Sequence, residues 1–95
     1  MKIWDKLAFA SFSFYLLIVI KMFSIIQKYL YDKENLTYVL DYLIDYKEKN
    51  NKKFNIDKAK NYLINLYIKK QNNELTKTKI NDKINKLLYY ITYDF

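Results

Sequence analysis

Hydrophobic positions divide the chain into an apolar head and a tail with a helical repeat. Residues 7–20 carry no charged side chain, and after Lys21 a second apolar piece covers residues 22–26. At about 1.5 Å per residue, a helix over residues 3–26 would be about 36 Å long, enough for the ~30 Å hydrocarbon core of a bilayer. This pattern predicts a single transmembrane helix in the head.

Residues typical of membrane interfaces flank the apolar head. Trp4 stands before it, and Lys21, Tyr29 and Tyr31 stand towards its far end. Trp and Tyr rings prefer the headgroup level, and a Lys near a helix end extends its ammonium group towards water. We expect these four residues to anchor the helix at the two membrane faces. A cleavable signal peptide is the main alternative, but no small-x-small cleavage site follows the apolar run.

Beyond the head, apolar side chains recur at spacings of three and four in three segments. The first ends before residues 50–53, the second begins after Asn55 and ends before residues 71–73, and the third begins after Thr76 or Thr78. This spacing places the apolar residues of each segment on one helix face. The predicted packing face consists of Leu36, Val39, Leu40, Leu43, Ile56, Leu63, Leu66, Ile80, Ile84, Leu87, Leu88 and Ile91.

The expected fold is all-α, with a single N-terminal transmembrane helix followed by two or three amphipathic helices in a basic tail. Residues 1–31 would form the transmembrane helix with its interface anchors, and residues 32–95 the hydrophilic, lysine-rich tail. Residues 88–93 also have strand propensity, which leaves the end of the last helix open. Each predicted helix has an apolar arc to cover, so we expect that the tail does not fold alone.

Composition removes most catalytic chemistry. The chain has no His, Cys, Gly, Pro or Arg. His is the usual proton carrier near neutral pH, Cys is a frequent zinc ligand, and Gly builds phosphate-binding loops. Asp41 and Asp45 lie one helical turn apart, but two carboxylates without further ligands are more typical of a solvated helix face than of a cation site. We expect no catalytic, cofactor or metal site, and bound lipid as the only candidate ligand.

The formal net charge is +7, and acids are interspersed among the lysines. Mixed charges are typical of solvated helix faces and argue against nucleic acid as a partner. More lysines follow the apolar head than precede it, which predicts a tail on the inner side of the membrane, in the cytoplasm or the mitochondrial matrix. Lys, Asn, Ile, Tyr and Phe have AT-rich codons, and their abundance points to an AT-rich genome such as that of an organelle.

The order of residues at the N-terminus adds a family resemblance. The chain opens with Met1-Lys2-Ile3-Trp4-Asp5-Lys6-Leu7. This opening resembles that of mitochondrial ATP synthase protein 8 in its protist and plant form, typically Met-Pro-Gln-Leu-Asp-Lys-Phe. Met1, Asp5 and Lys6 match at the same spacing, and Phe14-Tyr15-Leu16 is similar to the family's Phe-Trp-Leu. Lys2-Ile3 and Trp4 depart from the family pattern, and the resemblance is confined to residues 1–20.

The resemblance implies a non-catalytic, organelle-encoded stator subunit of the proton-translocating ATP synthase in the mitochondrial inner membrane. Its helix would lie beside the proton-channel subunit, and its tail would enter the matrix and join the peripheral stalk. Three alternatives stay open. They are an accessory single-span subunit of a respiratory-chain complex, a divergent organellar ribosomal protein whose tail lysines bind phosphate, and a membrane protein of an AT-rich bacterium.

Overall fold

The computed structural model describes residues 3–93, with side chains for residues 17–93. Within this part of the chain all regular structure is helical, which confirms the all-α prediction and gives the tail three α-helices. The elements are α1 (Ile3–Tyr31), the short 3-10 helix η1 (Lys33–Asn35), α2 (Leu36–Lys49), α3 (Ile56–Gln71) and α4 (Lys77–Tyr93).

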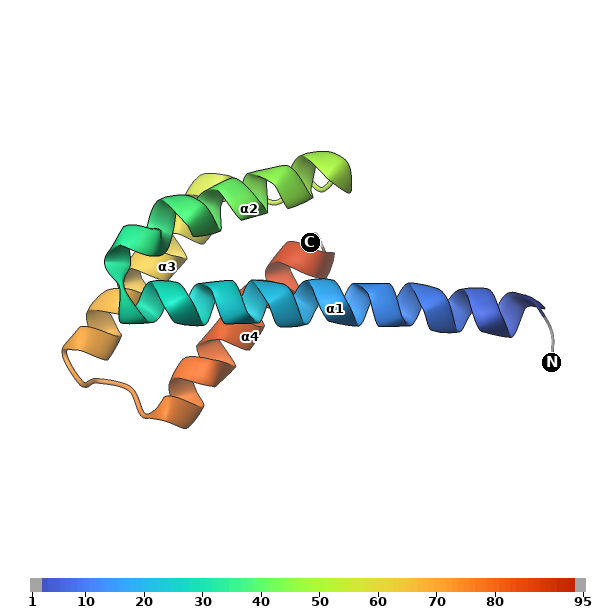
Figure 1. Ribbon diagram of the computed structural model, residues 1–95. Helices are drawn as coiled ribbons and strands as arrows, with labels where there is room; N and C mark the ends of the chain where they lie inside the picture. The colour runs from blue at the N-terminus through green and yellow to red at the C-terminus, as the bar shows by residue number, and fades with distance from the viewer. Residues whose placement is uncertain (1–2, 94–95) are drawn as a thin grey trace.

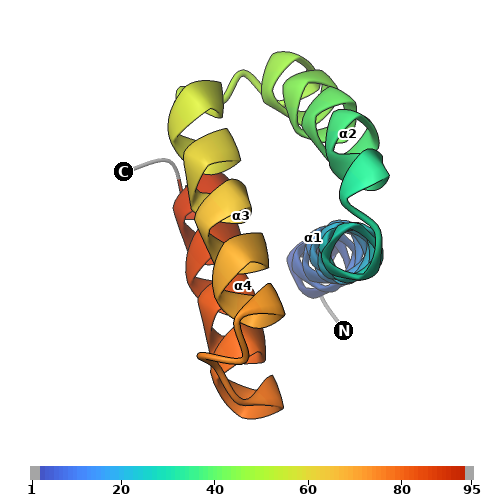
Figure 2. The ribbon, with the colours of Figure 1, turned by 90° about the vertical axis from the view of Figure 1, so that its left-hand side faces the viewer.

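The helix α1 is the longest element and organises the molecule. Its 29 residues form one unbroken helix, about 43 Å long at 1.5 Å per residue. Its C-terminal half lies in the bundle, whereas its N-terminal half extends beyond the other helices (Figure 1). Seen along α1, the helices α3 and α4 lie side by side across it, and α2 returns along its flank (Figure 2).

The turns are built from Asn and Asp, because the chain has no Gly. Asn51 and Asn73 follow the ends of α2 and α3 with φ of 52° and 56°. These angles lie in the left-handed region, which Gly adopts most easily and Asn more easily than most other residues. Both turns have the Schellman hydrogen bonds: Lys52 N–H donates to the Lys47 carbonyl at 2.9 Å, and Glu74 N–H donates to the Lys69 carbonyl at 3.0 Å. Both predicted helix breaks are therefore present.

Side-chain caps mark where helices begin. The Asn55 side chain accepts a hydrogen bond from Lys58 N–H at 3.0 Å, and the Thr76 hydroxyl accepts one from Lys79 N–H at 3.3 Å. Each cap satisfies one of the amide groups that a helix leaves unpaired in its first turn. Of the two threonines that the sequence offered as caps for the last helix, the structure uses Thr76.

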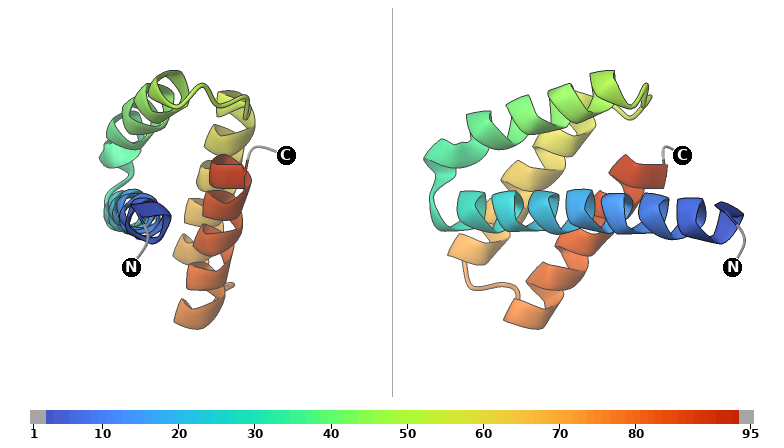
Figure 3. Two further views of the ribbon diagram at one scale, coloured as in Figure 1. Left: turned by 90° about the vertical axis from the view of Figure 1, so that its right-hand side faces the viewer. Right: turned by 45° about the vertical axis from the view of Figure 1, so that its right-hand side comes forward.

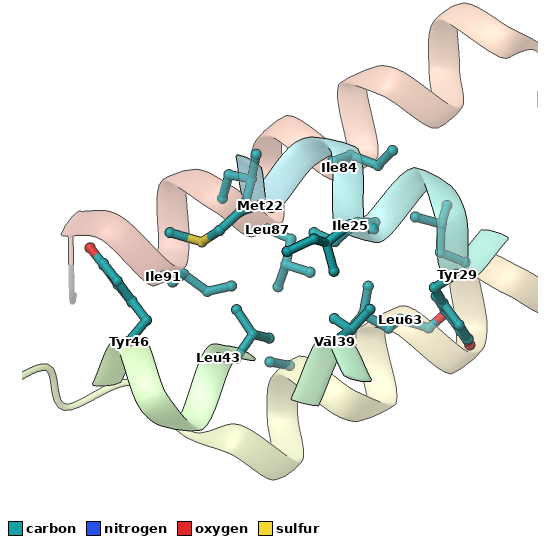
Figure 4. Packing of buried hydrophobic residues seen from close by; sticks show 14 of the residues in the cluster. Met22, Ile25, Tyr29, Val39, Leu43, Tyr46, Leu63, Ile84, Leu87 and Ile91 are labelled. Atoms are coloured by element: carbon teal, nitrogen blue, oxygen red, sulfur yellow. The ribbon is translucent and has the colours of Figure 1, made fainter. Parts of the chain in front are cut away.

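One hydrophobic core joins all four α-helices. Figure 4 shows side chains from α1 meeting those of α2, α3 and α4 in a single cluster. The cluster comprises Met22, Ile25, Ile26, Tyr29, Leu30, Val39, Leu43, Tyr46, Phe54, Ala59, Leu63, Leu66, Ile84, Leu87, Leu88 and Ile91. Fully burying one such side chain contributes about 1.5–3 kcal/mol, so the members from α1 are a substantial part of this small core.

The predicted division at residue 31 coincides with the end of α1, but packing does not follow it. Met22, Ile25 and Ile26 are 5% exposed or less, and they contact the tail helices instead of extending the apolar head. The sequence could not distinguish these roles, because a bilayer and a protein core both take apolar residues. The C-terminal half of α1 and the tail therefore form one packing unit.

Candidate interaction surfaces

The point where α1 leaves the bundle is the first candidate surface. Leu17 and Ile20 are 66% and 58% exposed, whereas Ile18 and Val19 pack against the edge of the core. Met22 is the first fully buried residue among the described side chains of α1. Among the described side chains of α1, contact with the tail helices therefore begins near residue 18, beside the exposed apolar side chains of Leu17 and Ile20.

Most of the residues that carry the family resemblance lie outside the described part. Met1 is outside it altogether, and the side chains of Asp5, Lys6 and residues 14–16 are also outside it, although α1 begins at Ile3. The side chain of Trp4, one of the predicted interface anchors, lies outside it as well. Among the residues that the structure describes, none of the helices combines the length and the apolar character that crossing a membrane requires.

Tyr29, one of the predicted interface anchors, lies in the core instead. It is 2% exposed, and its hydroxyl donates a hydrogen bond to the Leu63 carbonyl at 3.3 Å. Its ring centroid lies 5.5 Å from that of Tyr67, also on α3. Burial, together with the neighbouring Tyr67 hydroxyl, raises the pKa of Tyr29 above its usual 10.0. Tyr29 lies one turn after Ile25 and so continues the buried face of α1.

The other two described anchors are exposed and contact partners on the tail helices. Lys21 places its ammonium 5.5 Å from the ring centroid of Tyr42. Tyr31 is 84% exposed, and the Lys70 ammonium lies 4.6 Å from its ring centroid. The same ammonium donates to the Leu30 carbonyl at 2.9 Å. Lys70 thus provides a cation at the C-terminal end of α1, where the helix dipole favours positive charge.

All twelve residues of the predicted packing face are buried or half-buried. The half-buried ones are Leu36, Leu40, Ile56 and Ile80, and the fully buried ones are Val39, Leu43, Leu63, Leu66, Ile84, Leu87, Leu88 and Ile91. The face omitted Phe54, which is 2% exposed between two polar neighbours and carries no helical repeat that would reveal it. It also omitted Tyr46, whose spacing from Leu43 and Val39 could have placed it on the same face.

Long polar side chains connect helices at the edge of the core. The Tyr62 hydroxyl donates to the Lys83 carbonyl at 2.8 Å, and burial raises the pKa of Tyr62. The Lys52 ammonium donates to the Thr92 carbonyl at 2.7 Å. Burial also raises the pKa of Tyr42, helped by Tyr38 and Asp45 and opposed by Lys49. These contacts position helices and present no nucleophile next to a base.

The acids and an open cleft show what ligand chemistry the described residues offer. Among them, no three His, Cys, Asp or Glu side chains gather as a metal ion would require. Asp45 of the Asp41–Asp45 pair binds the Lys49 ammonium at 3.1 Å, an exposed pair within α2. An open cleft of about 630 Å³ lies between the end of α1 and the α3–α4 turn, with Leu30, Leu75 and Lys77 among its lining residues.

Two tyrosines of α4 lie near the point where α1 leaves the bundle. Tyr89 and Tyr93 on α4 are 56% and 50% exposed, with ring centroids 4.5 Å apart. They line the same shallow hollow as Val19 of α1.

Neither a protein-family model, nor a curated protein, nor a solved structure matches the chain.

Proposed function

We propose that the chain is a non-catalytic membrane subunit of the mitochondrial proton-translocating ATP synthase. It would support the stator beside the proton-channel subunit and contact the peripheral stalk through its tail. The resemblance of the N-terminus at Met1, Asp5 and Lys6 supports this family. Close to the apolar head, three lysines (Lys21, Lys28 and Lys33) follow it and two (Lys2 and Lys6) precede it, which supports a tail in the matrix.

The observation that carries the proposal is the continuity of α1. One unbroken helix runs from Ile3 to Tyr31, and its C-terminal half supplies Met22, Ile25 and Tyr29 to the core of the tail bundle. A stator subunit must resist torque between membrane and stalk. A continuous helix, held at one end by a packed core, transmits such a force without a flexible linker.

The packing of α1 also changes the segment available for the membrane. Since Met22, Ile25 and Ile26 are buried against the tail helices, the proposed span covers residues 3–20. A helix of that length is about 27 Å long, near the lower limit for crossing a hydrocarbon core of ~30 Å. Lys21 would then lie at the matrix-side headgroups.

Native electrophoresis of gently solubilised mitochondrial membranes, with mass spectrometry across the gel, tests the assignment. We expect this chain to peak in the band that carries oligomycin-sensitive ATP hydrolysis. A peak with a respiratory complex or with the ribosome would refute the ATP synthase assignment. Carbonate washing of the same membranes tests the anchor separately, because an integral subunit is retained and a ribosomal protein is released.

A further inference from the structure

One end of the bundle faces the direction in which α1 departs. The C-terminal ends of α2 and α4 both lie on this side, and so does the start of α3 (Figure 3). Lys49 and Asn50 line a hollow together with Ile18 and Lys21 of α1, and the Asn55 N–H donates to the Tyr90 hydroxyl at 3.2 Å. We call this end the exit face and define it as Leu17, Ile20, Lys21, residues 45–58, Tyr89 and Tyr93.

We propose that the exit face rests on an anionic lipid surface, with Tyr89 and Tyr93 at the headgroup level and the exposed Lys49 and Lys53 at the lipid phosphates. This inference rests on the proposed function, because it takes the N-terminal half of α1 to be in the bilayer. The inference places the tyrosines of the membrane interface on α4, whereas the sequence predicted Tyr29 and Tyr31 on α1 for that role.

Geometry supports the choice of tyrosines. Tyr29 is in the core, and Tyr31 lies eleven residues beyond Ile20, which is about 16 Å further along α1. Tyr89 and Tyr93 instead share a hollow with Val19, next to the exposed Leu17 and Ile20. Exposed aromatic rings at the level where an apolar helix emerges are typical of a membrane interface.

Charge is compatible with phosphate at the exit face. Lys21, Lys47, Lys49, Lys52, Lys53 and Lys58 belong to it, against the acids Asp45, Glu48 and Asp57. The Lys49 side chain is 73% exposed, and Lys53 is also exposed. Each Lys near an anionic membrane adds to the attraction, within a Debye length of about 8–10 Å.

The opposite end of the bundle has a similar excess of lysines, including Lys69, Lys77 and Lys79. Charge alone would therefore attract either end to the membrane. Only the direction of α1 and the position of the Tyr89–Tyr93 pair select the exit face, and this difference makes the inference testable with matched variants.

Spin labels on the full chain in vesicles provide the test. The chain has no Cys, so one introduced Cys is a unique attachment point. Asn50→Cys and Asn72→Cys are matched sites, because both residues are exposed helix C-caps, at the exit face and at the opposite end. Ser11→Cys reports on the proposed span. The vesicles are phosphatidylcholine alone or mixed with phosphatidylglycerol, and the readout is accessibility to a water-soluble nickel chelate and to oxygen.

We expect the label at residue 11 to be accessible to oxygen and not to the chelate. In vesicles with phosphatidylglycerol, chelate access at residue 50 should fall several-fold, while access at residue 72 stays high. If the label at residue 11 reports lipid but the labels at residues 50 and 72 are equally accessible, the inference is wrong, because the exit face does not contact the lipid surface. If residue 11 reports water, the membrane anchor fails and the inference fails with it.

Paired substitutions separate a lipid contact from bulk charge. With the label at residue 50, Lys49→Gln with Lys53→Gln should restore chelate access in phosphatidylglycerol vesicles. Lys77→Gln with Lys79→Gln removes the same charge from exposed residues at the opposite end and should change nothing. Equal effects of the two pairs would contradict the exit-face assignment.

Discussion

At the scale of single residues, Tyr and Lys side chains do more than cover the surface. Tyr29 and Tyr62 donate to carbonyls on neighbouring helices, and Lys70 and Lys52 donate to the carbonyls of Leu30 and Thr92 near the ends of α1 and α4. The last carbonyls of a helix have no partner within it. AT-rich codons account for many of the lysines and tyrosines, but those four have defined structural contacts.

Tyr29→Phe tests the buried hydroxyl. At neutral pH we expect a loss of about 0.5–1 kcal/mol in the free energy of unfolding, because a long neutral hydrogen bond to the Leu63 carbonyl disappears. Above pH 10.0, the usual pKa, the unfolded state releases the Tyr29 proton while the folded state keeps it. The stability of the parent protein therefore falls from that pH upward until the raised folded pKa is passed.

Urea unfolding followed by circular dichroism at neutral pH and above pH 10.0 measures both effects. The Tyr29→Phe variant should lose less stability between the two conditions than the parent. Tyr31→Phe is the control, because Tyr31 is 84% exposed. Equal pH dependence in the parent and in Tyr29→Phe would show that the buried hydroxyl is not responsible.

At the scale of elements, Asn replaces Gly as the residue that ends helices. Asn51 and Asn73 both occupy the left-handed position after a helix, and both are followed by the hydrogen bonds of a Schellman motif. Asn tolerates this conformation better than other residues with a Cβ, because its short side chain can hydrogen-bond locally. A chain without Gly or Pro can therefore still turn sharply.

Asn73→Ala should lower the free energy of unfolding by about 1 kcal/mol, since Ala is strained at positive φ. Asn73→Gly should be neutral or slightly stabilising, because Gly adopts this conformation freely. Asn72→Ala is the matched control at φ of −83° and should have almost no effect. Thermal unfolding of the three variants measures this order, and a larger loss for Asn72→Ala than for Asn73→Ala would contradict it.

At the scale of the whole molecule, α1 belongs both to the head and to the bundle. Met22, Ile25 and Ile26 form part of the core with the tail helices. A tail without them lacks three buried side chains, each contributing about 1.5–3 kcal/mol. This sum is comparable to the total stability of a small domain, about 5–15 kcal/mol.

Two fragments test this interdependence. Residues 27–95 should show no cooperative thermal transition as a monomer, whereas residues 17–95 should show one, because only the longer fragment contains Met22, Ile25 and Ile26. Circular dichroism during heating, with the molecular mass checked by light scattering, gives the comparison. A cooperative transition of monomeric 27–95 would overturn both the sequence-based expectation and the role assigned to α1.

Several features of the fold were determined by the sequence alone. Helix positions, the Asn55 cap and the breaks after α2 and α3 depend on residues within a turn or two of each other. The apolar repeat likewise identified Leu63, Ile84 and Ile91 as members of one face on each helix. Such features are local, so periodicity and capping preferences are sufficient to predict them.

The tertiary structure alone decided what covers each face. Periodicity states which side chains point the same way, but apolar residues serve a bilayer and a protein core equally well. For that reason Met22 and Tyr29 were assigned to the membrane region from sequence, although α2, α3 and α4 bury them. The position of Tyr89 and Tyr93 beside Val19 also depends on how α4 crosses α1, a relation between distant segments that no local pattern contains.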